Sequence, residues 1–326
     1  MRDRKISLLA LQETHLTKSE EDSLNSVFHE KLHIVSSIDT THPNAKGVAL
    51  VWNKMTTNTH GIVSHEIVPG RALLATVPWH REERMTILVV YAPNDPTHIR
   101  EFWETIKIEL GNLPKPDVIL GDFNLVEDAL DRLPPHLDPL SASEPLQDLK
   151  RSLKLTDGWR RENPDSISFT FAQSAAQGGS QSRIDRIYVR DDWLPFSKEW
   201  EIDPPGIHTD HQLVSVRLST PRMPFIGKGR WTLPIFILQD NTVKEEIIRL
   251  GTDLQKRLND CNTVRSEGDN PQIHFRNFKD AVSWVCRSEA KKAVPKIQKT
   301  IESLKRTLKE VLEDGNLDEE DKRLTS

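Results

Sequence analysis

The sequence predicts an α/β domain built from layers of strands and helices, followed by a helical extension. Short runs rich in Val, Ile, Leu and aromatic residues recur through the first two thirds of the chain. Amphipathic helical patterns lie between some of these runs. After a connector marked by Pro and Gly, the periodicity becomes helical. The 326 residues therefore divide into a domain at 1–220, a linker at 221–239 and a helical extension at 240–326.

The expected strands are short, and many are nearly continuous in apolar residues. Such runs are typical of strands that are covered on both faces. They comprise residues 6–11, 47–52, 72–77, 86–91, 118–121, 168–171, 184–189 and 213–218.

Three helices are expected between these strands. Thr17 followed three residues later by Glu20 predicts a capping box at the start of a helix over residues 17–28. Apolar residues at helical spacing predict the other two, over 97–110 and 146–155.

The connector and the extension also carry local signals. Asp240 is positioned to cap a first helix, and a second helix can begin at Asn270-Pro271. Pro295 is expected to break or restart that second helix. An apolar stripe over 297–311 then predicts a helix that packs on its neighbours or forms a short coiled coil. The connector is marked by Pro221, Pro224, Gly227 and Gly229.

Composition excludes several classes of protein. The net charge of −5 argues against a simple basic nucleic-acid coat protein, although residues 1–219 carry −8 and the remainder carries +3. Cys261 and Cys286 cannot build a disulfide framework, so we expect two ordinary thiols in a reducing, intracellular compartment. Nothing approaches the roughly 20 apolar residues of a membrane helix, so no membrane association is expected.

Four carboxylates stand where apolar runs end, which is where layered α/β folds place their ligands. These carboxylates are Glu13, Asp122, Asp185 and Asp210. Clustered carboxylates repel one another unless a cation lies among them, and oxygen ligands suit Mg²⁺ or Mn²⁺. The sequence therefore predicts a divalent-metal site.

Three further side chains at these positions add hydrogen-bonding and acid–base groups. Tyr91 and Asn124 can donate hydrogen bonds to a phosphate without adding charge, and His211 can act as acid, base or charge stabiliser. Together with the carboxylates they suit metal-assisted phosphodiester hydrolysis. Each motif alone has an ordinary interpretation, because Gly121-Asp122-Phe123-Asn124 can be only a turn and an Asp-His pair is more often structural.

The order of the motifs resembles the endonuclease/exonuclease/phosphatase superfamily with the deoxyribonuclease I-like fold. The likeness covers about residues 6–219 and is greatest to the apurinic-type endonuclease domain of LINE-type (non-LTR) retrotransposons. It is carried by five segments in the family's order, namely Gln12-Glu13-Thr14-His15, Tyr91-Ala92-Pro93, Gly121-Asp122-Phe123-Asn124, Ser182-Arg183-Ile184-Asp185 and Asp210-His211.

The resemblance implies a role for each matching residue. Glu13 would bind the metal with help from Asp210, and Tyr91 and Asn124 would contact the scissile phosphate. Asp122 would align or deprotonate the attacking water. Asp185 would orient His211, which would stabilise the transition state or transfer a proton. Two hydroxyls, those of Thr170 and Ser182, would bind substrate phosphate or nearby backbone, with ordinary strand hydroxyls an equal alternative.

The resemblance also implies the architecture and the partners. The fold would be a four-layer α/β sandwich of two packed sheets flanked by helices, without the opening strand that carries an Asn in the family. The extension, including Trp231 in the linker, resembles the segment that precedes a reverse transcriptase. The implied partners are DNA and the RNA of the element, and the implied compartment is the nucleus.

Three functional hypotheses stay open at this point. The leading one is a retrotransposon-derived, Mg²⁺-dependent endonuclease that nicks DNA and leaves a 3′ hydroxyl. The second is an abasic-site nuclease or another phosphoesterase of the superfamily. The third is an inactive remnant that only binds nucleic acid, which the expected absence of the opening strand favours.

Overall fold

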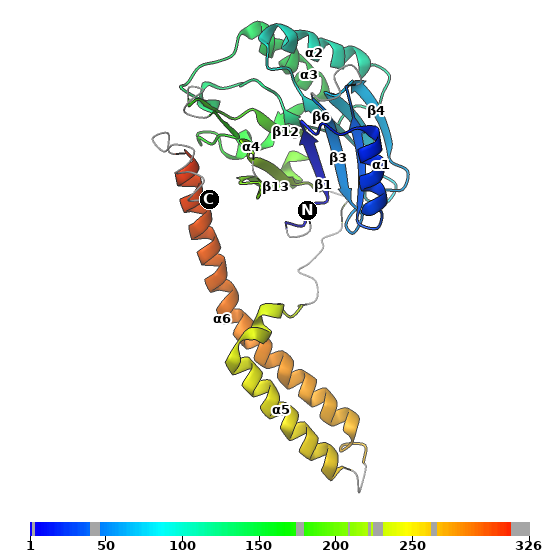
Figure 1. Cartoon of the computed structure of the whole chain (residues 1–326), viewed down its shortest axis with the longest axis vertical. Helices are drawn as coiled ribbons and strands as arrows, with labels where there is room; N and C mark the ends of the chain where they lie inside the picture. The colour runs from blue at the N-terminus through cyan, green and yellow to red at the C-terminus, as the bar shows by residue number, and fades with distance from the viewer. Residues whose placement is uncertain are drawn as a thin grey trace. The chain divides into compact units, whose positions relative to one another are not determined.

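The chain divides into two compact units, Met1–Pro224 and Phe225–Ser326 (Figure 1). Among the described residues, no helix combines the length and the apolar character that crossing a membrane requires. The computed structural model describes residues 1, 4–39, 46–173, 179–207, 209–220, 223, 231–261 and 266–313.

A six-stranded sheet forms the centre of the first unit. Its strands follow the order β4-β5-β6-β7-β12-β9, in which β6 and β7 are parallel and the other neighbours are antiparallel. Apolar residues on both faces bury its central strands, as the near-continuous apolar runs predict. The strands are β4 Val63–Val68, β5 Ala72–Pro78, β6 Arg84–Tyr91, β7 Val118–Asp122, β12 Asp185–Arg190 and β9 Leu155–Asp157.

A second strand layer packs on one face of this sheet. It consists of an antiparallel sheet in the order β1-β3-β2 and the antiparallel pair β13–β14. A shared apolar cluster joins the two layers and contains Trp52, Ile87 and Trp200. The strands are β1 Leu8–Gln12, β2 Leu32–Ser37, β3 Val48–Asn53, β13 Lys198–Asp203 and β14 Leu213–Arg217.

Helices cover the two outer faces. Helices α2 (Pro96–Glu109) and α3 (Leu140–Leu153) bury their apolar sides against the free face of the six-stranded sheet (Figure 1). Helix α1 (Lys18–Val27) covers the outer face of the β1-β3-β2 sheet, where Leu24 packs on Val51. The order helix, sheet, sheet, helix confirms the predicted four-layer α/β sandwich.

The ends of two helices illustrate how local sequence sets the boundaries. Thr17 and Glu20 form the predicted capping box of α1. Helix α3, in contrast, begins at Leu140, six residues before the predicted start. It ends because Lys154 adopts a left-handed conformation with φ of 54°, so that the next residues join the sheet as β9.

Short elements complete the first unit. A small sheet in the order β10-β11-β8 lies along one end of β12, and it brings the segment around Ser182 into position. These elements are β8 Arg132–Leu133, β10 Phe171–Ala172, β11 Gln181–Ser182, helix α4 Gly158–Glu162, and 3₁₀ turns at Ala129–Asp131 and Leu194–Phe196.

The second unit is helical, which confirms the predicted helical extension. A 3₁₀ turn (Ile235–Gln239) precedes α5 (Asn241–Asp260), and Asp240 caps α5 by accepting from the backbone N–H groups of Thr242 and Val243. Helix α6 (Pro271–Glu313) runs through Pro295 without a break, so the predicted interruption there is wrong. The connector residues Pro221, Pro224, Gly227 and Gly229 lie outside the described residues.

Candidate active site

Three neighbouring strands place Tyr91, Asp122 and Asp185 in one row. Tyr91 is the register partner of Asp122 in the parallel pair β6–β7. Asp122 is in turn the partner of Asp185 in the antiparallel pair β7–β12. Because the Cα atoms of directly opposed residues in an antiparallel pair are roughly 4.5–5.5 Å apart, the register alone brings the two aspartates together.

Asp122 is the most buried carboxylate of this row, with 5% of its surface exposed. Its Oδ1 accepts a hydrogen bond from the backbone N–H of Asn124 at 2.8 Å. Burial raises the pKa of Asp122 well above its ordinary value, and the charge of the neighbouring Asp185 raises it further. The folded protein therefore disfavours the ionised form of Asp122.

His211 and Asp185 form a hydrogen-bonded pair. The imidazole Nδ1 of His211 lies 2.8 Å from Asp185 Oδ2, and the ring packs against Phe171 with their centroids 4.9 Å apart. Burial would lower the pKa of His211, but the hydrogen bond to Asp185 and the charges of Asp185, Asp122 and Asp210 outweigh it and raise this pKa to about 9. The imidazole is therefore cationic at neutral pH.

The buried hydroxyl of Thr170 holds the backbone where β12 begins. Thr170 Oγ1 accepts from the backbone N–H of Ile184 at 3.0 Å and from that of Asp185 at 2.9 Å. Thr170 is fully buried, so its hydroxyl satisfies two donors that water does not reach. Its contacts are thus to the backbone that carries Asp185, one of the two roles considered for it.

Tyr91 and Glu13 meet at the edge of this row. The Tyr91 hydroxyl donates to Glu13 Oε1 at 2.5 Å, and burial and this hydrogen bond raise the pKa of the phenol. The guanidinium of Arg71 lies 5.1 Å from the centroid of the Tyr91 ring. Glu13 has a left-handed backbone with φ of 52°, a conformation that side-chain-bearing residues rarely adopt outside functional or turn positions.

Asn124 also has a left-handed backbone, with φ of 48°, and lies directly after β7. Its side-chain amide donates to the carbonyl of Ala92 at 2.8 Å, which fixes the side chain on the end of the neighbouring strand β6. Asn124 is therefore held beside Asp122 by both its backbone and its side chain.

Asp210 and Ser182 lie at the margins of the arrangement. Asp210 is exposed, and its charge contributes to the raised pKa of the adjacent His211. Ser182 Oγ accepts from Arg132 Nε at 3.3 Å. Its hydroxyl therefore contacts an arginine side chain, whereas the hydroxyl of Thr170 contacts the backbone before and at Asp185. The structure thus gathers Glu13, Tyr91, Asp122, Asn124, Asp185, Asp210 and His211 around the ends of neighbouring strands, and Thr170 holds the backbone of Asp185.

The donor set fits a hard divalent cation. Every carboxylate of the site offers oxygen ligands. A bound cation would favour the ionised form of Asp122, which burial first and the charge of Asp185 second now disfavour. In the described part of the chain, no three of these side chains bring ligand atoms within 4.8 Å of one another. Mg²⁺ commonly binds through one or two carboxylates and completes its shell with water and substrate phosphate, which this open arrangement allows.

An ionic network beneath the site was not predicted from the sequence. Arg183, 2% exposed, donates to both carboxylate oxygens of Asp131 at 2.7 and 2.8 Å and lies 2.8 Å from Asp157 Oδ2. Burial would raise the pKa of Asp131, but the hydrogen bond and charge of Arg183 lower it overall. The signal available in the sequence was an arginine directly before an apolar strand-like run, and such a residue needs a partner if it is buried.

Comparison with known proteins agrees with this geometry. The model of the Endonuclease/Exonuclease/phosphatase family matches residues 2–223. The transposon TX1 uncharacterized 149 kDa protein of Xenopus laevis is 30% identical over 223 residues, which is 67% of this chain. The chain spans 16% of the length of that protein.

Solved structures support the same fold. The 3′ phosphatase NExo from Neisseria, solved with a product DNA hairpin, is 20% identical with a TM-score of 0.52, covering 67% of this chain and 91% of that one. The AP endonuclease LMAP from Leishmania major is 15% identical with a TM-score of 0.54, covering 65% and 78% respectively. At these identities the likeness shows the fold alone. The family match, which extends over more than half of the chain, shows that the protein belongs to the endonuclease/exonuclease/phosphatase family.

Proposed function

We propose that residues 1–224 form a divalent-metal-dependent endonuclease of a retrotransposon, which hydrolyses one strand of DNA and leaves a 3′ hydroxyl. The observation that carries this proposal is the cluster of Asp122, Asp185 and His211, in which a carboxylate of raised pKa lies beside a cationic imidazole. The similarity to the TX1 transposon protein of Xenopus laevis supports the retrotransposon origin. DNA as substrate implies a nuclear location.

Acid–base roles follow from the charges of these groups. Asp122 is the general base in the proposal, because its raised pKa brings it closer to the operating pH and makes it a better proton acceptor. It would take a proton from the water that attacks phosphorus as the bond from phosphorus to the 3′ oxygen breaks. The departing 3′ oxygen would receive a proton from the cationic His211, which Asp185 orients.

The remaining residues would position the phosphate. Tyr91 and Asn124 flank Asp122 on the neighbouring strand and in the following turn. The second N–H of the Asn124 amide would bind a non-bridging phosphate oxygen, and the Tyr91 hydroxyl would do so by exchanging its donation to Glu13 for the phosphate. Glu13 and Asp210 would hold the Mg²⁺ or Mn²⁺ ion. When bound, that ion would supply positive charge against the phosphate and the developing oxyanion.

A supercoiled plasmid tests this proposal. We expect the full chain to convert the plasmid to the open-circular form with Mg²⁺ or Mn²⁺ and not with EDTA. DNA polymerase should extend the nicks directly, because they carry 3′ hydroxyls. Well-folded protein that nicks neither with Mg²⁺ nor with high Mn²⁺ would overturn the proposal.

An abasic duplex in the same assay separates the second candidate function, which the common fold with the AP endonuclease LMAP favours. Cleavage of the abasic strand with intact plasmid left untouched would assign the site to abasic DNA instead.

A further inference from the structure

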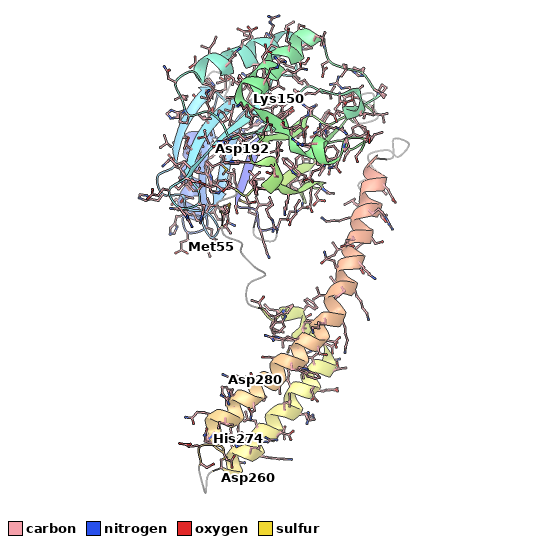
Figure 2. The ribbon with its side chains drawn as sticks, turned by 180° about the vertical axis from the view of Figure 1, so that it is seen from behind. Met55, Lys150, Asp192, Asp260, His274 and Asp280 are labelled. Atoms are coloured by element: carbon pink, nitrogen blue, oxygen red, sulfur yellow. The ribbon has the colours of Figure 1, made fainter. Side chains whose placement is uncertain are left out.

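Three side chains of different chemistry converge at one end of the α5–α6 hairpin. Cys261 follows the last residue of α5, Asp269 precedes α6, and His274 lies in the first turn of α6. Figure 2 shows His274 at the same end of the hairpin as Asp260, where α5 ends. The Cys261 Sγ atom lies 3.1 Å from His274 Nε2 and 3.6 Å from Asp269 Oδ1, and the latter two atoms are 2.7 Å apart.

The geometry argues against a catalytic thiol. In a nucleophile–histidine–carboxylate relay, the nucleophile and the carboxylate bind opposite nitrogens of the ring, so that a proton can pass through it. Here Cys261 and Asp269 both contact Nε2 of His274. The other ring nitrogen, Nδ1, is buried and has no hydrogen-bond partner among the described residues. The three groups thus point at one common position rather than along a chain.

Convergence of this kind suits a metal ion. The three donor atoms lie within 4.8 Å of one another. In a tetrahedral zinc site with bonds of roughly 2.0–2.3 Å, neighbouring ligand atoms are about 3.4–3.6 Å apart. The observed separations of 2.7–3.6 Å would reach those values if Nε2 of His274 moved less than an ångström away from both Asp269 and Cys261.

The donor types select the ion. A thiolate and an imidazole are ligands that Zn²⁺ prefers and that Mg²⁺ avoids, and a carboxylate is acceptable to Zn²⁺. Cys261 is 5% exposed and the His274 side chain 12%, whereas the Asp269 side chain is 63% exposed. A fourth ligand would therefore come from the water side, next to Asp269.

We infer that Cys261, Asp269 and His274 form a Zn²⁺ site that fastens the start of α6 to the end of α5. The unit has a small apolar core, in which four buried residues, Ile237, Val243, Cys286 and Ala290, form the centre. Small cores gain stability from a structural metal ion. This site is independent of the proposed nuclease function, because its residues all lie in the second unit.

Cobalt substitution of the full chain tests the site. Reduced protein titrated with Co²⁺ should develop a thiolate-to-cobalt charge-transfer band in the near ultraviolet, saturating at one ion per chain. Equimolar Zn²⁺ should abolish the band. A Mg²⁺ site built from carboxylates cannot produce this band, so the signal reports Cys coordination alone.

Single substitutions test which side chains bind the metal ion. Cys261→Ser and His274→Gln should each remove the band, and Zn²⁺ should raise the melting temperature of the wild type but not of either variant. Cys286→Ala is the matched control, because Cys286 lies twelve residues beyond His274 on α6, about 18 Å along the helix, and should leave the band intact. Reduced wild-type protein without the band, or a band that survives in Cys261→Ser, would overturn the inference.

Discussion

The imidazole of His211 lies 2.8 Å from the carboxylate of Asp185, although 26 residues separate them in the chain. Asp185 begins β12 opposite Asp122, while His211 reaches the same point through a bridge to Phe171 just before β14. Asp185 is therefore the register partner of the proposed base and the hydrogen-bond partner of the proposed acid, and the first predictions depend on that arrangement.

The first prediction concerns the charge of His211. In protein without added metal, the imidazole C–H resonances should titrate with a pKa of about 9. In Asp185→Asn the pKa should fall, because the hydrogen bond and charge of Asp185 are lost while burial remains; the charges of Asp122 and Asp210 still oppose burial. Nuclear magnetic resonance of the two proteins measures this shift, and an unchanged pKa in the variant would show that the pair does not control the proton.

The direction of this pKa shift also makes the stability of the fold depend on pH. Because folding raises the pKa of His211, this group stabilises the fold fully below about pH 6.5, and the contribution disappears as the pH rises through about 9. Asp185→Asn should weaken this dependence, because only the charges of Asp122 and Asp210 would still raise the pKa.

The second prediction is a conflict between stability and activity at Asp122. Its raised pKa means that the folded state penalises the ionised form, so stability is lost as the pH rises from about 4 through the raised value. Asp122→Asn should stabilise the metal-free protein at neutral pH by about 0.5–2 kcal/mol and abolish nicking. Urea unfolding measures the gain. A destabilised variant would contradict the penalty that the folded state places on ionised Asp122.

The third prediction assigns Thr170 a positioning role. Thr170→Val removes the acceptor of two buried N–H groups and should lower the free energy of unfolding by about 1–3 kcal/mol. Nicking should fall as well, because Asp185 would no longer be held in register. Thr170→Ser keeps the hydroxyl and should recover most of both losses. Equal activity in the Val and Ser variants would assign Thr170 to packing only.

The fourth prediction concerns the buried Asp131–Arg183 pair. Asp131→Asn should destabilise the first unit by about 3–5 kcal/mol at neutral pH, because Arg183 stays buried beside a weaker acceptor. Folding lowers the pKa of Asp131, so its contribution is present above about pH 4 and is lost below it. The exposed Asp148→Asn is a matched control that should change stability little. Similar effects of the two substitutions would refute a structural role for the pair.

The sequence indicated which side chains lie together more completely than it indicated the strands. Glu13, Asp122, Asp185 and His211 follow or begin apolar runs, and such runs are visible without a structure. β2 and β13 were not predicted, because segments such as Lys198–Asp203 carry few apolar residues and become strands only by pairing with a neighbour. β4 was missed for a different reason, because its apolar residues neither run continuously nor alternate with polar ones.

Side-chain contacts between residues far apart in the sequence could not be predicted either. Nothing local indicates that Arg183 pairs with Asp131, or that Cys261 meets His274 across the turn of a hairpin. The sequence alone suggested an ordinary thiol at Cys261, since no second ligand stands at a familiar spacing. At Pro295 local propensity pointed to a break, whereas α6 continues through it.

The most direct test of the proposed function is the plasmid-nicking rate of the wild type beside His211→Ala and Asp122→Ala, each verified as folded by circular dichroism. With Mg²⁺ we predict nicking by the wild type and a loss of at least about 10²-fold in each variant, the size expected for a general acid or base. Wild-type nicking that persists unchanged in both variants would contradict the proposed function of this site.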